Sequence, residues 1–317
     1  MENRTFTQML RMSFKSDDTE EWLDVHFTRP FGLVFALMWM KFGVHPNAVT
    51  ILSIFLGSAA GVMFYFTDLT HNLIGVLLLM LGNFCDSTDG QMARLTGKKT
   101  LVGRVLDGFS ENVWFFFIYI AIVFREGNAW APTMGLWAYA LAFFLCFCAG
   151  VFCHQPQCMM ADYYRQIHLY FLLGKQGSEL DSYASQRAIY ESLPRRRWFA
   201  RLFYFNYSNY CHGQEQRSPQ FQRFFHEVKR RWPNAEDMPQ PLRDDFRRGS
   251  LPLMKYTNLL TFNLRAIIVY VTCCLGCPII YPIAELTLFA LMYWHMCRTH
   301  EALCSRLYQQ LTADRKL

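Results

Sequence analysis

Six stretches of the chain are long and apolar enough to form membrane-spanning helices. A helix needs about 20 mainly apolar residues to cross the hydrocarbon layer of a bilayer. An earlier stretch, Pro30 to Phe42, is too short to span, and its Phe, Met and Trp content is typical of an amphipathic helix on the membrane surface. The pattern predicts an all-α, polytopic integral membrane protein whose six spans lie at roughly 48–67, 72–95, 101–124, 133–155, 258–276 and 279–297.

The polar segments between these stretches divide the chain into four predicted parts. Residues 1–45 form a polar lead that ends in the surface helix, and residues 46–173 contain the first four spans. A long polar insertion, 174–256, separates them from residues 257–317, which hold the last two spans and a tail. The lead lacks the apolar core of a cleavable signal peptide, so we expect none.

Basic residues are sorted to one side of the predicted bundle. An even number of spans places both termini on the same side. The short loops on the opposite side, 68–71, 125–132 and 277–278, hold one basic residue, Arg125, although the net charge of the chain is +6. Positive residues accumulate on the cytoplasmic side of membrane proteins. We therefore expect the termini, the Gly97-Lys98-Lys99 turn and the insertion to be cytoplasmic.

The insertion alternates basic clusters with aromatic residues. This composition favours short amphipathic helices resting on anionic lipid headgroups. Basic patches with aromatics also occur in nucleic-acid-binding proteins, but the position beside a membrane argues against such a partner. The residues concerned are Arg195-Arg196-Arg197, Lys229-Arg230-Arg231 and Arg247-Arg248, with Trp198, Phe203, Tyr204, Phe221, Phe224 and Phe225.

Four carboxylates lie near the cytoplasmic ends of the second and third predicted spans. The sequence reads Asp86-Ser-Thr-Asp89-Gly90-Gln-Met-Ala93-Arg94, then eight residues to Gly103, then Arg-Val-Leu-Asp107-Gly-Phe-Ser-Glu111. Helical spacings of three and four place each acidic pair on one face. The short turn between the spans makes them antiparallel neighbours, so the two faces can meet. Carboxylates inside membrane segments are costly and usually functional.

Such a cluster requires a cation, because converging carboxylates repel one another at low dielectric. Hard oxygen donors favour Mg²⁺ or Mn²⁺ over zinc. The small residues Gly90, Ala93 and Gly103 would let a bulky substrate approach the backbone, and Arg94 supplies a bidentate phosphate partner. A buried ion-pair cluster is the alternative, but four acids against Arg94 and Arg104 leave it unbalanced.

The acidic stretch resembles the signature of the CDP-alcohol phosphotransferase family, D-x2-D-G-x2-A-R-x8-G-x3-D-x3-D, with Glu111 in place of the last aspartate. The segment His45-Pro46-Asn47-Ala-Val-Thr50 is similar to the entry of the family's first transmembrane helix. Asn47 and Thr50 are either contacts of the nucleotide or simply a helix start, and we favour the helix start. The resemblance covers most of the chain outside the 174–256 insertion.

This resemblance assigns expected roles to the motif. Asp86, Asp89 and Asp107 would hold one or two divalent ions on the CDP pyrophosphate. Glu111 completes the acidic set and would act as general base on the acceptor hydroxyl. The CDP pocket would be shaped by Gly90, Ala93, Arg94 and Gly103. Family members are commonly homodimers, so we expect a homodimer here.

Two arginines outside the motif are candidates for acceptor binding. Arg265 lies inside the fifth predicted span, where an arginine needs a partner or a water-filled cavity. Arg165 lies just past the fourth span. The resemblance to the phosphatidylinositol-phosphate synthase branch implies that both hold the phosphate of the acceptor. The alternative is snorkelling or pairing with a carboxylate, such as Asp162 for Arg165.

The sequence thus predicts a Mg²⁺- or Mn²⁺-dependent transferase of phospholipid synthesis that releases CMP. The expected donor is CDP-diacylglycerol and the expected acceptor is a polar alcohol such as inositol phosphate. A CDP-amino alcohol reacting with a lipid hydroxyl is the alternative within the family. A cation-binding transporter or scaffold is the alternative from another class, but transporters usually show broken helices and internal symmetry, and neither is evident here.

Overall fold

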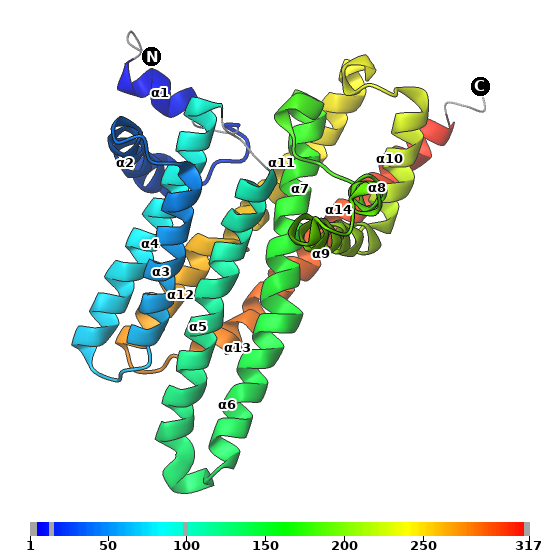
Figure 1. Cartoon of the computed structure of the whole chain (residues 1–317). Helices are drawn as coiled ribbons and strands as arrows, with labels where there is room; N and C mark the ends of the chain where they lie inside the picture. The colour runs from blue at the N-terminus through cyan, green and yellow to red at the C-terminus, as the bar shows by residue number, and fades with distance from the viewer. Residues whose placement is uncertain (1–4, 13–15, 98–100, 314–317) are drawn as a thin grey trace. The chain divides into compact units, whose positions relative to one another are not determined.

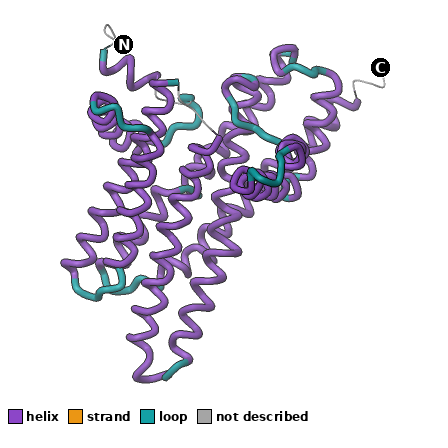
Figure 2. The backbone as a smooth tube through the Cα atoms, in the orientation of Figure 1, coloured by secondary structure: helices purple, strands orange, loops and turns teal. Residues whose placement is uncertain are grey.

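The computed structural model describes residues 5–12, 16–97 and 101–313, apart from the side chains of residues 101, 102, 104, 105, 107 and 176. Within these residues every regular element is a helix and no strand occurs (Figure 2). The chain divides into two compact units, the first formed by Met1–Pro156 with Thr261–Ala290 and the second by Gln157–Leu260 with Leu291–Leu317.

The first unit is built from long helices joined by short turns (Figure 1). Its α-helices are α1 (Phe6–Met12), α2 (Arg29–Lys41), α3 (Pro46–Met63), α4 (Leu69–Thr96), α5 (Leu101–Met134), α6 (Trp137–Phe147), α12 (Phe262–Cys274) and α13 (Ile280–Ala284). Three π-helical segments interrupt the regular helices: η1 (Asp24–Thr28), η2 (Cys148–His154) and η5 (Glu285–Phe289).

The second unit is also built from helices. They are α7 (Gln155–Leu173, from Gln157 on), η3 (Lys175–Gly177), α8 (Tyr183–Ser192), α9 (Trp198–Gln216), α10 (Pro219–Arg231), η4 (Ala235–Asp237), α11 (Gln240–Leu259) and α14 (Ala290–Ala313, from Leu291 on). Its interior is a stack of aromatic rings, in which Phe171 lies 3.9 Å from Phe246 between ring centroids and Tyr164 lies 3.9 Å from His300. The 174–256 segment therefore contributes packed helices to this unit.

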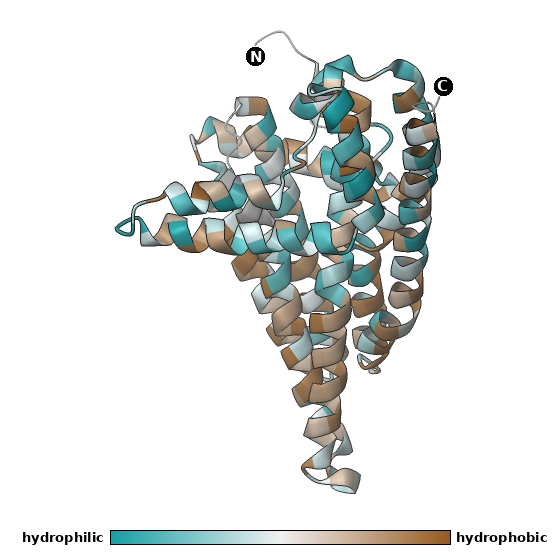
Figure 3. Ribbon diagram, turned by 90° about the vertical axis from the view of Figure 1, so that its right-hand side faces the viewer, coloured by the Kyte–Doolittle hydropathy of each residue, from teal (hydrophilic) through white to brown (hydrophobic). Residues whose placement is uncertain are grey.

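Five helices of the described chain are long and apolar enough to cross a membrane, so we treat the chain as an integral membrane protein. They bear large exposed apolar side chains, such as Phe55 (69% exposed) and Phe116 (59%), which is the surface that lipid requires. Much of the α5–α6 hairpin, the lowest feature of Figures 1 and 3, is hydrophobic. The five candidates are Pro46–Met63, Leu69–Thr96, Gly108–Met134, Trp137–Leu173 and Gln240–Cys274.

The sixth predicted span, 279–297, is helical but is not one of these five candidates. It runs from α13 through η5 into α14, and the polar residues Glu285, Thr287 and His295 lower its hydropathy. Similarly, α2 occupies the segment predicted to lie on the membrane surface, and the structure shows that it packs against α4. A membrane location of these two segments stays a prediction.

The predicted loop at 125–132 is wrong, because α5 continues through it to Met134. Arg125 and Glu126 directly follow the third predicted span, 101–124, yet both residues are buried inside the structure. Arg125 donates hydrogen bonds to the carbonyl of Phe64 (3.1 Å), to Asn72 Oδ1 (2.9 Å) and to the carbonyl of Cys273 (3.1 Å). One guanidinium therefore joins the ends of α3 and α12 to the start of α4.

Helix α3 packs closely against both α4 and α5 because small residues face its neighbours. A Cβ atom on Gly57 would lie 2.1–2.4 Å from ring atoms of the fully buried Trp114 of α5. A Cβ atom on Gly82 of α4 would lie 3.4 Å from the carbonyl oxygen of Ser53. The glycines therefore determine how near α4 and α5 come to α3.

We expect Gly57→Ala to lower the stability of the protein by about 1–3 kcal/mol, because overpacking a close contact displaces side chains and backbone. This cost exceeds the gain of up to ~1 kcal/mol in helix propensity. Thermal unfolding in detergent measures it. Gly108→Ala is the matched control, since Gly108 also lies in α5 and a Cβ atom there would meet no heavy atom of the described residues within 4 Å. Equal unfolding temperatures for the two variants would contradict the close contact.

Candidate active site

The motif residues lie at the C-terminal end of α4 and the N-terminal half of α5, beside the start of α3. Helix α3 is capped by His45, whose ring Nδ1 accepts a hydrogen bond from the backbone N–H of Asn47 at 3.2 Å. Pro46 at the first helical position suits this start, because its missing N–H would have no partner there. The helix start places Thr50 one turn inside α3.

Asp89 of α4 is held by α3. It is buried, with 5% of its surface exposed, and its Oδ2 accepts a hydrogen bond from the hydroxyl of Thr50. Asp86, one turn earlier and half-buried, is held by α5, because its Oδ1 accepts from Ser110 Oγ at 2.8 Å. The two aspartates therefore share one end of α4, and each carboxylate is oriented by a different neighbouring helix.

Helix α2 fixes the same end of α4 from another side. Gln91 Nε2 donates to the carbonyl of Arg29 at 3.0 Å. The hydroxyl of Thr88 lies 3.2 Å from the carbonyl of Gly32, in addition to its 2.6 Å hydrogen bond to the carbonyl of Phe84 in α4. Arg29 is itself held by Glu20 through two hydrogen bonds of 2.7 and 3.0 Å. The segment that carries Asp86 and Asp89 is thus supported by three helices.

Arg94 lies over Gly90. A Cβ atom at Gly90 would be 3.3 Å from Arg94 Nη1, so the glycine leaves room for the guanidinium one turn further along α4. Helix α4 ends soon afterwards at Gly97, which has the left-handed conformation (φ 68°) that glycine adopts without strain. Ala93 is half-buried on the same helix, and Gly103 lies in the first turn of α5.

The donors at this site suit a hard cation, because Asp86 and Asp89 offer oxygen ligands of the kind that Mg²⁺ and Mn²⁺ prefer. Among the side chains that the structure describes, no group of three His, Cys, Asp or Glu residues is close enough to hold a metal ion. The side chain of Asp107 lies outside the described part, as does the Lys98-Lys99 turn. Glu111 is half-buried on α5, directly after Ser110.

Arg265 of α12 lies in a buried polar cluster of the first unit. Its side chain is 0% exposed and forms an ion pair with Glu285, which is equally buried. His154 Nδ1 lies 3.3 Å from Glu285 Oε1 and 3.1 Å from Arg265 Nη1, and Tyr281 donates its hydroxyl proton to Glu285. The partner that an arginine inside a span requires is therefore Glu285.

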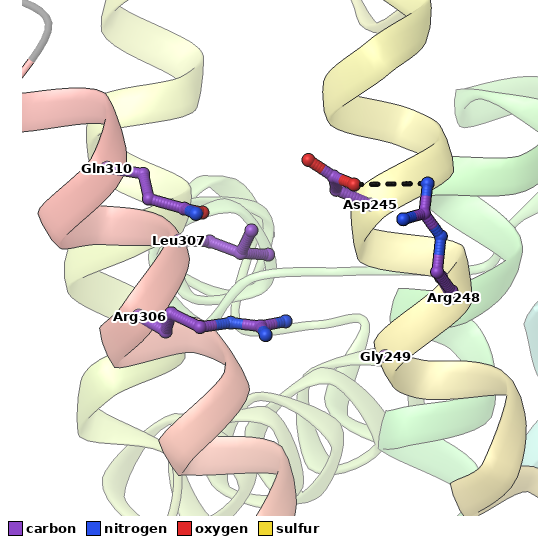
Figure 4. Close-up of a pocket in the computed structure, with 6 residues that line it drawn as sticks. All are labelled: Asp245, Arg248, Gly249, Arg306, Leu307 and Gln310. Carbon is purple, nitrogen blue, oxygen red and sulfur yellow. Dashed lines mark ion pairs between the residues drawn. The ribbon is translucent and has the colours of Figure 1, made fainter.

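Arg165 lies in the second unit and donates a hydrogen bond to Asn258 Oδ1 at 3.0 Å. Asp162, the alternative partner considered for Arg165, accepts from Gln166 at 3.3 Å. The second unit also has a groove of about 260 Å³ that contains none of the motif residues (Figure 4). It is lined by Asp245, Arg248, Gly249, Arg306, Leu307 and Gln310.

Two polar residues beside the motif contact its aspartates. Thr50 belongs to the start of α3, and its hydroxyl also contacts Asp89. Ser110, for which the sequence predicts no role, immediately precedes Glu111 and contacts Asp86. The fixed spacing of Thr50 from Pro46 was a usable signal, whereas nothing in the sequence distinguishes Ser110 from any other polar residue at a helix end.

Comparison with known proteins agrees with this site. Residues 43–168, which include the whole motif, match the sequence model of the CDP-alcohol phosphatidyltransferase family. The chain is 39% identical over 67 residues to an uncharacterized protein of Aquifex aeolicus (21% of this chain, 33% of that protein). It is 35% identical over 71 residues to an archaetidylinositol phosphate synthase of Pyrococcus horikoshii (22% of this chain, 36% of that protein).

The chain thus matches about a third of the length of these curated relatives. The family match begins before α3 and ends inside α7, so it includes the helices that hold Asp86 and Asp89. Over residues 43–168, which are less than half of its length, the chain is similar to the CDP-alcohol phosphatidyltransferase family.

Proposed function

We propose that the protein transfers a phosphatidyl group from CDP-diacylglycerol to a polar alcohol and releases CMP. The observation that carries this proposal is the pair of aspartates at one end of α4, each oriented by a hydroxyl from a neighbouring helix within the family match. Acidic side chains in a membrane helix are retained when they serve a site. The name of the Pyrococcus relative, an archaetidylinositol phosphate synthase, favours inositol phosphate as the acceptor.

Asp86, Asp89 and Asp107, with Glu111, are the residues that would hold a divalent cation. When bound, Mg²⁺ or Mn²⁺ neutralises charge on the pyrophosphate and on the departing CMP. Arg94 contributes a fixed positive charge for a phosphate of the donor, and Gly90, Ala93 and Gly103 keep the backbone accessible beside it. These residues together constitute the proposed CDP site.

Glu111 is the proposed general base. In this role its carboxylate accepts the proton of the acceptor hydroxyl as that oxygen attacks the phosphate of the donor. Glu111 directly follows Ser110, which donates a hydrogen bond to Asp86, and this position beside the proposed cation site supports the assignment. Glutamate has the same carboxylate chemistry as the aspartate of the family pattern, with one methylene more.

The proposed topology has six spans, with 279–297 as the last, and a surface helix at α2. Both termini, the active site and the 174–256 insertion are cytoplasmic in this proposal. The distribution of basic residues supports it, because the short segments assigned to the opposite side are almost free of lysine and arginine. A homodimer is proposed from the family resemblance.

Arg165 and Arg265 remain the proposed contacts of the acceptor phosphate. Arg165 is half-buried in the second unit and keeps one hydrogen bond to Asn258. Arg265 is already paired with Glu285, so acceptor binding there would require the guanidinium to exchange this partner for a phosphate. Replacing both residues, Arg265→Met with Glu285→Leu, distinguishes ion pairing by Arg265 from phosphate binding by Arg265.

The decisive experiment is a CMP-release assay with the full chain purified in detergent. CDP-diacylglycerol is offered with inositol phosphate, inositol, glycerol phosphate or serine, and CDP-ethanolamine is offered with diacylglycerol. We expect CMP only with the first donor, most strongly with inositol phosphate, and only with Mg²⁺ or Mn²⁺ present. CMP from CDP-ethanolamine would reassign the donor. No CMP from either donor would leave a cation-binding transporter or scaffold as the better interpretation.

We expect Thr50→Val to reduce CMP release by about 10–100-fold, the usual effect of removing a group that orients a metal ligand. Valine keeps the shape of threonine but removes the hydroxyl that donates to Asp89. Thr50→Ser keeps the hydroxyl and should retain most of the activity. Thr272→Val is the control, because Thr272 donates within its own helix, to the carbonyl of Ile268. Full activity of Thr50→Val would show that Asp89 does not need this contact.

A further inference from the structure

The hairpin of α8 and α9 (residues 183–216), which lies outside the family match, has features that the proposed transfer reaction does not use. The turn between its helices carries Arg195, Arg196 and Arg197, all exposed. Within the described part of the chain none of the three forms an ion pair or a side-chain hydrogen bond. Three adjacent guanidinium groups of this kind form a surface that is complementary to anions.

An apolar stripe follows this turn directly. Trp198, Leu202 and Phe205 are spaced four and three residues apart on α9, so they share one helical face, and Phe199 lies beside it. Their exposed fractions are 68% for Trp198, 63% for Phe199, 52% for Leu202 and 39% for Phe205. The buried face of α9 is a different one, formed by Tyr207, Ser208, Cys211 and Gln214.

The hairpin is built to keep this stripe in place. Arg201 donates to the carbonyls of Leu193 (2.6 Å) and Tyr190 (3.3 Å), which are end groups of α8, and its guanidinium lies 4.4 Å from the Tyr190 ring centroid. Tyr207 donates its hydroxyl proton to Asp181 at 2.7 Å. The exposed aromatic residues are therefore presented by a fixed pair of helices.

The orientation of the hairpin fits a membrane surface. In the second unit α8 and α9 run across the direction of α7, as both Figure 1 and Figure 3 show. Helix α7 belongs to the candidate span Trp137–Leu173, and α9 is attached to it where Gln214 donates to the carbonyl of Met159 at 3.3 Å. About 20 residues cross the hydrocarbon layer, so a span that enters at Trp137 leaves it close to Met159.

We propose that the α8–α9 hairpin is a membrane-surface anchor that binds anionic phospholipid headgroups. The guanidinium groups of residues 195–197 hold lipid phosphates through bidentate hydrogen bonds. The stripe of Trp198, Phe199, Leu202 and Phe205 enters the boundary between headgroups and acyl chains, where tryptophan is favoured. Charge and apolar area together give the stable surface binding that neither gives alone.

The test uses the full chain in lipid nanodiscs and measures quenching of tryptophan fluorescence by brominated lipids. The chain has eight tryptophans, so the signal of Trp198 is the difference between wild type and Trp198→Phe. The bilayers contain phosphatidylglycerol, and the bromine atoms lie either near the headgroup or at the end of the acyl chain. We expect the Trp198 signal to be quenched about twofold or more strongly by bromine near the headgroup, because interfacial helices lie only ~5–10 Å deep. A Trp198 signal that no brominated lipid quenches would overturn the proposal and leave the surface for a second copy or another macromolecule.

The arginines are tested by Arg195→Gln, Arg196→Gln and Arg197→Gln combined in one variant. We expect its Trp198 quenching to be the same with and without phosphatidylglycerol, whereas wild type responds to it. The matched control combines Arg223→Gln, Arg248→Gln and Arg306→Gln, three exposed arginines elsewhere in the second unit, and should behave as wild type. If both variants lost the response to phosphatidylglycerol equally, the response would be a general effect of positive charge, and a specific headgroup site would be refuted. The readout needs no transferase activity, so it is independent of the proposed function.

Discussion

Replacing Asp89 with asparagine is expected to lower CMP release at least about 10³-fold, which corresponds to about 4 kcal/mol of transition-state stabilisation. Asp89 is a buried carboxylate of the family motif, oriented by Thr50. Asparagine has nearly the same shape, and its amide oxygen can still accept the threonine hydroxyl. The variant should therefore fold, and the loss should follow from the missing negative charge at the proposed cation site.

The matched control makes the same chemical change at the other end of α4. Asp68 caps the N-terminus of this helix, where Oδ1 accepts from the backbone N–H of His71 at 3.0 Å. Asparagine caps helices as well as aspartate does, so Asp68→Asn should retain wild-type activity and a similar unfolding temperature. If Asp89→Asn were as active as Asp68→Asn, the motif would not be the centre of the reaction.

Glu285→Leu is expected to destabilise the protein by about 3–5 kcal/mol, because it leaves the buried guanidinium of Arg265 without its carboxylate. Arg265→Met should cost a similar amount by leaving Glu285 behind. The double variant, Arg265→Met with Glu285→Leu, should recover most of the loss, since apolar side chains of similar volume often replace a buried ion pair without penalty. Thermal unfolding in detergent measures all three.

The same double variant decides what Arg265 does in the reaction. If the pair only joins α12 to η5, a stable double variant should release CMP at the wild-type rate with an unchanged KM for the acceptor. A stable double variant with a strongly raised acceptor KM would instead support phosphate binding by Arg265. If the double variant unfolds as readily as the single ones, the pair is not the main reason for the instability.

The sequence predicted the spans that contain long uninterrupted apolar runs, such as α3 and α4, because hydrophobic length alone determines them. It failed at 125–132, where the gap between two apolar stretches predicted a loop and α5 continues instead. Arg125 is accommodated inside the first unit by carbonyls of Phe64 and Cys273, and no local pattern reports such distant acceptors. The presence of these helices therefore follows from composition, whereas the residue at which α5 ends depends on tertiary hydrogen bonds.

In the candidate site, too, some features follow from sequence spacing and others depend on how the helices pack. The spacing of Asp86 and Asp89 on one helix follows from helical geometry. Their contacts with Ser110 and Thr50 join residues 24 and 39 positions apart, and only the packed helices bring them together. Likewise, the position of Arg265 indicated that it needs a partner, but several acidic residues were available and the fold selected Glu285.

Arg125 also has a consequence for how the protein is made. Its third acceptor, the carbonyl of Cys273, lies 148 residues further along the chain. At about 5–20 residues per second, a ribosome needs roughly 7–30 s to add that length. During this interval the guanidinium of α5 has been synthesised and its last acceptor has not. Until α12 is made, the guanidinium has only the acceptors on Phe64 and Asn72, which precede it in the chain.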